Sequence, residues 1–340
     1  MLKRVAIIGH FGDGETLLNG QTIKTKIITA ALEKKIGSNE VLKVDTHGGF
    51  KAYLRLPFQL FNSLRRCTNA IILPAQRGLG LIAPMLVVSN VIFRRKLHYV
   101  VIGGWLPEWS GRKKKLRKCL KHLDAIYVET STMKRAMDEQ GFENVLVMPN
   151  FKDLKILEKP VVRNHFPRSL CTFSRVMKEK GIEDAVKAVS IVNRDAGKTV
   201  VTLDIYGQIE ASQNEWFEQL KQSFPEYISY RGIIPYDKSV SILQDYDILL
   251  FPTYYEGEGF AGTLLDAMAA GIPVIASDWK YNKDIVNEHT GVLVEPRNIE
   301  QLASAIESTI FDRYAKEKIL HEARRFLPEN AILVLCENLR

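Results

Sequence analysis

The feature that most constrains this chain is a regular alternation of short apolar runs and longer helical patterns. The apolar runs are rich in Val, Ile and Leu, and they cover residues 5–8, 41–44, 70–73, 98–102, 125–128, 145–148, 170–173, 199–206, 228–230, 248–251, 273–276 and 292–294. Strands that are buried on both faces of a parallel sheet have this continuous apolar character. The pattern therefore predicts an α/β fold built from βαβ units.

The twelve predicted strands divide into two groups of six. A chain of 340 residues is long enough for two domains, each with its own core. Between the groups, residues 149–167 contain three prolines and mixed charge, which is typical of a linker. We therefore predict two doubly wound, Rossmann-like domains at residues 1–150 and 168–340, joined by a linker at 151–167. A helical pattern from residue 299 to about 326 follows the last predicted strand.

The charge of the chain is distributed unevenly between these domains. Residues 1–150 contain 24 Lys and Arg against 11 Asp and Glu, whereas residues 151–340 contain 23 against 28, and the whole chain carries +8. The first domain therefore presents a positive field to an anionic partner. A membrane surface, a diphosphate-bearing acceptor and nucleic acid are all anionic, and charge alone does not separate them.

The cysteines and the apolar segments give expectations about location. The four cysteines lie far apart and form no CxxC pair, which favours a reducing, cytoplasmic setting over a disulfide framework or a zinc site. The longest apolar run, residues 79–93, contains Pro84, Ser89 and Asn90, and we expect it to be too short to cross a bilayer of about 30 Å. The apolar run at residues 5–8 is too short for a secretory signal.

The most informative stretch is residues 251–278. A predicted strand ends at Phe251, a glycine-rich loop follows, and a helix begins near Gly262 or Thr263 and ends at Gly271. Unpaired N–H groups at a helix start, together with the helix dipole, favour an anion such as a diphosphate. Two carboxylates, Glu258 in the loop and Asp266 inside the helix, can accept hydrogen bonds from sugar and ribose hydroxyl groups.

This stretch resembles the signature of the retaining glycosyltransferases of family 4. Their signature has two acidic residues separated by seven, and here it reads Glu258-Gly-Phe-Ala followed by Leu-Asp266-Ala-Met-Ala-Ala-Gly-Ile-Pro-Val. The resemblance implies the GT-B fold, with two facing Rossmann-like domains and a deep cleft between them. The family usually has Glu where this chain has Asp266, which is one methylene shorter. This form of the signature looks like that of enzymes that assemble bacterial surface polysaccharides, including capsule and lipopolysaccharide.

A second match is the segment 173–182, which carries Arg175 and Lys180 in a short loop between a strand and a helix. In the family the equivalent cations bind the donor diphosphate. They would neutralise the charge that develops on the leaving nucleoside diphosphate. The alternative is a solvated, salt-bridged loop. Together with Glu258, these two cations are our candidate catalytic residues.

The resemblance implies further donor-binding positions. Backbone groups of the loop and helix start, and of two strand ends near the nucleotide base, would line the donor site, and a loop of the first domain would reach toward the diphosphate. The corresponding residues are Gly259, Phe260, Ala261, Gly262, Thr263, Gly207, Gly232, Ile233, Ile234, Asn19 and Gly20. For the last two, the alternative is an ordinary glycine-rich turn.

One departure from the family concerns a histidine near the reacting sugar. Residues 101–108, after the fourth predicted strand, contain none. A backbone group, Glu108, His10 or His47 could replace it, although a lone loop histidine is more often structural.

Three other segments resemble known motifs only in part. Residues 196–199 resemble the end of a P-loop but precede a strand, so they are interpreted as a turn. Asp245-Tyr-Asp247 resembles a metal-binding DxD motif but adjoins a predicted strand, which favours a structural role. Residues 9–14 do not fit the dinucleotide fingerprint GxGxxG. We expect no metal and no cofactor, with a nucleoside-diphosphate sugar as the donor substrate.

Residues 112–121 form a dense cationic run. Leu116, Cys119, Leu120 and Leu123 recur within and after it at helical spacing. The favoured interpretation is a helix packed on the core with a solvated basic face. The alternative is peripheral contact with an anionic membrane on the inner face of the plasma membrane. Nucleic acid is not expected, because no known binding module accompanies the charge.

The leading hypothesis is a retaining, metal-independent transfer of a hexose-type sugar from a nucleoside-diphosphate sugar to a glycan or lipid-linked saccharide. One alternative is a nucleotide-sugar epimerase on the same fold. The other is a non-catalytic binding subunit that anchors a partner enzyme to the membrane.

Overall fold

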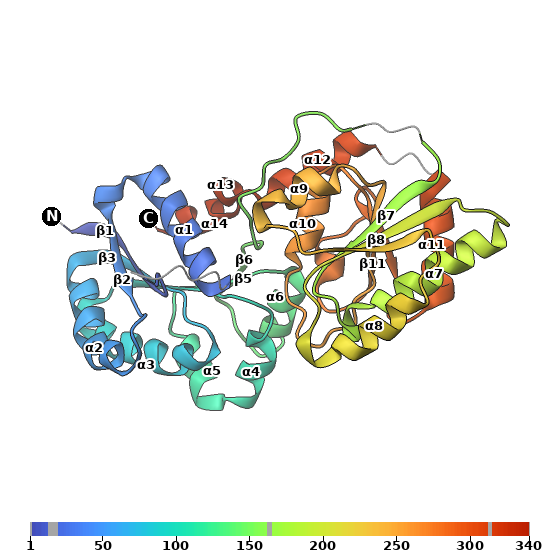
Figure 1. Ribbon diagram of the computed structural model, residues 1–340. Coiled ribbons are helices and arrows are strands. Elements are labelled where there is room, and N and C mark those ends of the chain that lie inside the picture. The colour runs from blue at the N-terminus through green and yellow to red at the C-terminus, as the bar shows by residue number, and fades with distance from the viewer. Residues whose placement is uncertain (1, 13–19, 162–164, 312–314, 340) are drawn as a thin grey trace. The chain divides into compact units, whose positions relative to one another are not determined.

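The computed structural model describes residues 2–12, 20–161, 165–311 and 315–339, and it contains two compact units (Figure 1). Unit 1 comprises Met1–Asp153 together with Pro328–Arg340, and unit 2 comprises Leu154–Leu327. Each unit contains a six-stranded sheet in which every neighbouring pair of strands is parallel.

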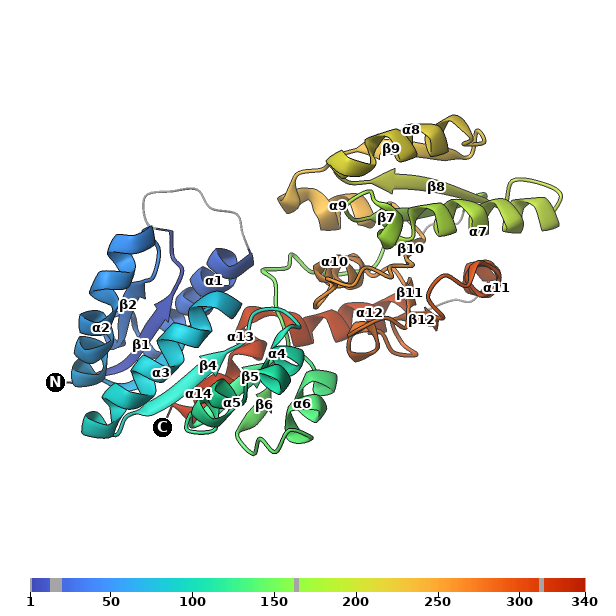
Figure 2. The ribbon, with the colours of Figure 1, turned by 90° about the horizontal axis from the view of Figure 1, so that it is seen from below.

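In unit 1 the strand order is β2-β1-β3-β4-β5-β6. The strands are β1 (Lys3–Gly9), β2 (Val41–Asp45), β3 (Cys67–Ile72), β4 (Lys96–Val100), β5 (Ala125–Val128) and β6 (Val145–Val147). The helices between them are α1 (Gly20–Ile36), α2 (Gly49–Arg66), α3 (Gln76–Phe93), α4 (Leu106–Arg112), α5 (Lys114–Leu120) and α6 (Ser131–Asp138). Because the chain turns back at β1 and crossovers are right-handed, α1 covers one face of the sheet, while α2, α3 and α5 cover the other (Figures 1 and 2).

In unit 2 the strand order is β12-β11-β10-β7-β8-β9. The strands are β7 (Arg168–Phe173), β8 (Val201–Tyr206), β9 (Ile228–Gly232), β10 (Ile248–Phe251), β11 (Val274–Ser277) and β12 (Gly291–Val294). The helices are α7 (Ile182–Asp195), α8 (Asn214–Gln222), α9 (Ser239–Leu243), α10 (Gly262–Ala269), α11 (Ile299–Phe311) and α12 (Lys316–Ala323). The winding direction reverses between β7 and β10, which makes this pair the topological switch point of the sheet.

Short 3₁₀ helices complete the two units. They occupy Ser38–Glu40, Lys178–Lys180, Ala211–Gln213, Tyr236–Lys238, Asn282–Asp284 and Arg324–Phe326.

All twelve predicted strands are confirmed, with ends that differ by up to three residues. The reason for this agreement is visible in β1, where Val5, Ala6, Ile7 and Ile8 are completely buried. A strand covered on both faces needs an unbroken apolar run, and this run is legible in the sequence.

The end of the chain differs from the prediction that residues 168–340 form one domain. Helices α13 (Pro328–Ala331) and α14 (Leu333–Asn338) belong to unit 1. Ala331, Leu335 and Leu339 are buried in the core of that unit beside β1 and α1, and Asn69 Nδ2 donates to the Leu339 carbonyl at 3.3 Å. These three residues recur every fourth position, so they form an apolar stripe that requires a second surface. Unit 1 provides that surface.

The predicted linker also differs from the observed connection. The boundary between the units falls at Asp153 and Leu154. Leu154 is buried in the core of unit 2, and the Leu157 N–H donates to the Ala269 carbonyl at 3.1 Å. Residues at the start of the predicted linker therefore pack on unit 2 instead of forming a free connection.

Helix α3 corrects our expectation about membrane-spanning segments. It contains 18 residues with a mean hydropathy of 1.4, so by length and composition alone it could cross a membrane. Pro84 does not shorten it, because the helix continues through that residue. Its buried face consists of Leu79, Ile82, Ala83 and Leu86, and the helix connects the neighbouring strands β3 and β4. It is therefore a crossover helix whose other face is largely exposed.

We predict that the C-terminal helices stabilise unit 1. Leu335 is completely buried, whereas Leu333 in the same helix is 42% exposed. Leu335→Ala should therefore lower the free energy of unfolding of unit 1 by about 2–5 kcal/mol. The matched change Leu333→Ala should cost less than about 1 kcal/mol. Denaturant unfolding of both variants tests this, and equal effects would contradict the packing of α14 on unit 1.

Candidate functional site

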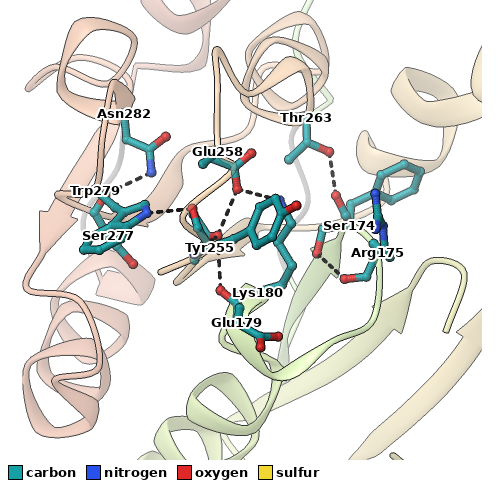
Figure 3. Close-up of polar contacts among 12 residues, drawn as sticks. Ser174, Arg175, Glu179, Lys180, Tyr255, Glu258, Thr263, Ser277, Trp279 and Asn282 are labelled. Atoms are coloured by element: carbon teal, nitrogen blue, oxygen red, sulfur yellow. Dashed lines mark hydrogen bonds and ion pairs between the residues drawn. The ribbon is translucent and has the colours of Figure 1, made fainter. Parts of the chain in front are cut away.

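The candidate site lies at the switch point of the unit 2 sheet. Two loops, residues 174–181 and 252–261, leave the carboxyl ends of the neighbouring strands β7 and β10. In doubly wound sheets ligands bind outside the carboxyl ends of the strands at such a point. The predicted residues of both loops lie here (Figure 3).

Lys180 and Glu258 meet at the centre of this site although they are 78 positions apart. Lys180 Nζ lies 2.5 Å from Glu258 Oε2, and Thr253 Oγ1 donates to the same oxygen at 2.9 Å. The two charged side chains are only 12% and 10% exposed. Lys180 Nζ also lies 5.5 Å and 5.2 Å from the ring centroids of Phe251 and Tyr255. The ammonium group is therefore enclosed by a carboxylate and two aromatic rings.

Backbone contacts hold the two loops together. The Tyr254 N–H donates to the Glu179 carbonyl at 2.8 Å. Gly181 has φ of +71°, and a Cβ atom at this position would lie 2.1 Å from the Pro252 carbonyl oxygen. Trp279 Nε1 donates to the Tyr255 carbonyl at 2.8 Å, which fixes the far side of the second loop. The positions of Lys180 and Glu258 thus depend on a glycine that brings the loops into contact.

Helix α10 begins beside this pair. Its N-cap residue is Ala261, which has no side-chain oxygen to accept a hydrogen bond from the first turn. Thr263 Oγ1 donates to the Phe173 carbonyl at 2.6 Å and ties the helix start to the end of β7. Apart from its chain neighbours and the backbone of its own helix, no described residue lies within 4 Å of the point where a Cβ on Gly262 would stand. The predicted segment 259–263 therefore presents a positive helix end beside open space.

Asp266, the second predicted acid, lies in the second turn of α10. It is 3% exposed and sits within the core of unit 2. The carboxylate is therefore more enclosed than the sequence suggested. Its contact with a ribose remains a prediction.

Arg175 is placed differently from Lys180. Its side chain is 55% exposed, and Nη1 lies 2.8 Å from Glu210 Oε2. The alternative interpretation of a solvated ion pair therefore describes Arg175, while Lys180 is enclosed. Exposed pairs of this kind contribute about 0–1 kcal/mol, so Arg175 can leave Glu210 at little cost.

The predicted glycines at the ends of β8 and β9 lie close to one another. The Gly207 N–H donates to the Gly232 carbonyl at 2.9 Å, and a Cβ on Gly207 would lie 1.7 Å from the Ser174 carbonyl oxygen. Ile233 is 68% exposed, whereas Ile234 packs against the core of unit 2. This edge therefore continues from the β7 loop toward β9.

Three residues of the site were missed from the sequence. They are Glu210, which pairs with Arg175; Thr253, which donates to Glu258; and Trp279, which anchors the second loop. None belongs to a motif, and each acts through a contact that only the folded chain creates. The position of Thr253, two residues after a predicted strand, was the one available signal.

Unit 1 has a pocket at its own switch point, between β1 and β3. Its volume is about 180 Å³, and its lining residues are His10, Gln21, Thr46, Leu56, Pro74, Ala75, Arg77, Gly78 and Ile82. His10 Nδ1 lies 2.8 Å from Thr22 Oγ1, and His10 Nε2 lies 3.0 Å from His47 Nδ1. The two histidines considered as substitutes for the family histidine are thus one hydrogen-bonded pair.

Three other candidate residues, Glu108, Asn19 and Gly20, also belong to unit 1. Glu108 is an exposed residue that forms an ion pair with Arg112 on the same helix. Asn19 lies outside the described residues, and Gly20 is the first residue of α1.

Two segments that resemble known motifs, Asp245-Tyr-Asp247 and residues 196–199, contribute to the fold. Asp247 Oδ2 accepts a hydrogen bond from the Ser169 N–H at 2.8 Å, which fixes the start of β7. Gly197 has φ of +64° and follows the last turn of α7, so residues 196–199 form a turn.

The predicted basic helix 112–121 is divided at Lys113 between α4 and α5. Leu116, Leu120 and Leu123 are buried, so this apolar stripe packs on the core as favoured. Lys114, Lys115 and Lys118 remain on the exposed face.

Comparisons with known proteins show what the chain is similar to. The family model of the glycosyl transferases group 1 matches residues 167–312. Glycogen synthase of Mycobacterium tuberculosis is 29% identical over 164 residues, which are 47% of this chain and 38% of that protein. The capsular polysaccharide biosynthesis glycosyltransferase CapM of Staphylococcus aureus is 28% identical over 156 residues, covering 44% of this chain and 39% of its own length. The chain thus spans about two fifths of these relatives.

Solved structures match over nearly the whole chain. Anabaena HepE in complex with UDP has a TM-score of 0.73 at 16% identity and covers 99% of both chains. The lipopolysaccharide outer core galactosyltransferase WaaB has a TM-score of 0.70 at 16% identity and covers 98% of both. These likenesses, together with the two parallel six-stranded sheets, define a protein of the GT-B fold. The family-model match, residues 167–312, lies within unit 2.

We predict that the contact at Gly181 is required for the site. Gly181 and Gly197 flank the same helix, and both have positive φ, but only Gly181 has a backbone oxygen where a Cβ would stand. Gly197→Ala should therefore lower the free energy of unfolding by about 1–2 kcal/mol, the cost of holding a residue with a Cβ in a left-handed conformation. Gly181→Ala should cost about 1–3 kcal/mol more, because the two loops must separate. Equal losses of unfolding free energy would contradict the close contact of the loops.

Proposed function

We propose that the chain is a retaining glycosyltransferase that moves a hexose-type sugar from a nucleoside-diphosphate sugar to a glycan or lipid-linked saccharide. The observation that carries this proposal is the meeting of Lys180, Glu258 and the N-terminus of α10 at the switch point of unit 2. A cation and a positive helix end suit a diphosphate, and a carboxylate suits sugar hydroxyl groups.

The hydrogen-bonding capacity of the pair supports this division of roles. An ammonium group has three donors, and Lys180 gives one of them to Glu258. Glu258 Oε2 accepts from both Lys180 and Thr253, whereas among the described residues Oε1 has no donor. Lys180 can therefore also donate to a phosphate oxygen, and Glu258 Oε1 can accept from a sugar hydroxyl.

The proposed reaction develops negative charge on the leaving diphosphate. The bond from the anomeric carbon to the diphosphate oxygen breaks, and a bond to the acceptor oxygen forms on the same face of the sugar. The acceptor proton passes to the departing diphosphate oxygen. Lys180, Arg175 and the amides of residues 260–263 stabilise that charge, and such fixed donors contribute a large part of catalysis at related centres.

The relatives suggest which substrates to test first. HepE is described in complex with UDP-glucose, and CapM acts in capsular polysaccharide biosynthesis. We propose a UDP-hexose as the first donor and a surface-polysaccharide intermediate as the acceptor. An epimerase would convert the donor without any acceptor, so product analysis in the absence of acceptor separates the two activities.

We predict that the central pair is required for transfer. Lys180→Ala and Glu258→Gln should each lower kcat by about 100-fold to 1,000-fold, because each removes a group that acts on the transition state. The neighbouring changes Lys178→Ala and Glu256→Gln alter exposed side chains and should leave kcat within about twofold. Steady-state kinetics with radiolabelled donor measures all four. Unaltered turnover in Lys180→Ala and Glu258→Gln would remove the mechanism.

Donor binding is tested separately by thermal shift with UDP-, GDP-, ADP- and dTDP-sugars. One nucleotide should raise the melting temperature of the wild-type chain, and Lys180→Ala should reduce that rise. A chain that responds to none of the four, yet is folded, would favour the non-catalytic alternative.

A further inference from the structure

Exposed apolar side chains are concentrated on one face of unit 1. Eleven large hydrophobic side chains of the described residues are exposed, and seven of them lie on α2 and α3. These seven are Leu54, Phe58, Phe61, Leu81, Val88, Val91 and Ile92. Phe58 is 81% exposed, and Val88, Val91 and Ile92 are each more than 70% exposed. Contiguous apolar surfaces of this kind mark interaction sites.

The seven side chains form one surface, which we name the α2–α3 face. On α3 they recur at positions 81, 88, 91 and 92, opposite the buried stripe, and on α2 they recur at positions 54, 58 and 61. The rings of Phe61 and Phe93 meet edge to face with centroids 4.9 Å apart, which joins the two stripes. A shallow hollow of about 550 Å³ lies on α2, lined by Leu54, Arg55, Phe58, Gln59 and Asn62.

Cations surround this face, and acids are almost missing from the sequence that forms it. Residues 46–123 contain fifteen Lys and Arg but a single acidic residue, Glu108. Cations occur on and at the ends of both helices: Arg55, Arg65, Arg66, Arg77, Arg94, Arg95 and Lys96. Helix α5, which contacts α3, adds the exposed Lys114, Lys115 and Lys118. The net positive charge of the chain is concentrated around its apolar face.

We propose that the α2–α3 face docks on an anionic lipid bilayer. Apolar side chains would enter the boundary between headgroups and acyl chains, and the surrounding cations would lie among anionic headgroups. A second copy of the chain fits the same face poorly. A two-fold interface would bring the cations of both copies together, and like charges oppose such contact.

The fold also determines how α3 meets the bilayer. One face of the helix is buried, and its ends continue into the neighbouring strands β3 and β4. If α3 left the sheet to span the bilayer, it would lose the contacts that bury Leu79, Ile82, Ala83 and Leu86. The helix therefore lies in the plane of the interface and does not span it. This assignment goes beyond the proposed function, since docking requires no nucleotide. It extends the contact from the basic residues 112–121 to the apolar α2–α3 face, which α5 borders.

Flotation of the purified full chain with vesicles tests the proposal. The wild type should float with vesicles of phosphatidylcholine and phosphatidylglycerol, and much less with phosphatidylcholine alone. Phe58→Ser combined with Val88→Ser and Ile92→Ser should lower vesicle binding by more than about tenfold. Lys114→Glu combined with Lys115→Glu and Lys118→Glu should have a similar effect. High salt should weaken binding of the wild type.

Matched controls test whether the effect belongs to the α2–α3 face or follows from any loss of exposed apolar or cationic side chains. Leu333→Ser changes an exposed apolar side chain of α14, and Lys34→Glu with Lys35→Glu changes exposed cations of α1 on the other side of the sheet. Both controls should bind vesicles like the wild type. All variants should keep the wild-type melting temperature and its shift with donor nucleotide, so a failure of the proposed function would be seen independently of docking.

Three results would overturn the proposal. The first is no binding of the wild type to anionic vesicles. The second is equal binding by the wild type and the triple serine variant. The third is a wild-type dimer in solution that the serine changes dissociate without any vesicle binding, which would assign the face to a second copy.

Discussion

The contact between the two loops at the switch point of unit 2 determines where the central pair of the candidate donor site, Lys180 and Glu258, lies. Gly181 allows the backbone after β7 to reach the Pro252 carbonyl, and Lys180, its neighbour in the chain, is thereby carried to Glu258. The same region holds the start of α10, where Ala261 leaves the first turn without a side-chain cap. A helix start that lacks its own cap is a place for a ligand anion to supply the missing acceptors.

Much of the fold was predictable because parallel strands that are buried on both faces leave unbroken apolar runs. The loop and helix start of the site were predictable for a similar reason, since glycines, an acid and a helix stop are local signals. The pairing of Lys180 with Glu258, and of Arg175 with Glu210, was beyond the sequence because it depends on strand order and side-chain direction. The packing of Ala331, Leu335 and Leu339 on unit 1 was not predicted, because it joins the end of the chain to segments more than 250 residues earlier.

Unit 1 combines an excess of cations with an exposed apolar face, and the two together suggest a partner that neither would indicate alone. The excess of Lys and Arg was visible in the sequence, and the structure shows that it surrounds exposed apolar side chains of α2 and α3. The expectation that the apolar run at residues 79–93 is too short to cross a bilayer was wrong as to length, because the helix extends from Gln76 through Pro84 to Phe93. One face of α3 is buried in the core of unit 1, and the opposite face is exposed and can contact a partner.

The most direct test of the central claim is a crystal structure of the chain with a nucleoside diphosphate. The account predicts pyrophosphate oxygens about 2.7–3.2 Å from Lys180 Nζ and from backbone N–H groups at the start of α10. A nucleotide whose pyrophosphate lies elsewhere, with Lys180 and Glu258 still joined and the helix start unoccupied, would contradict it.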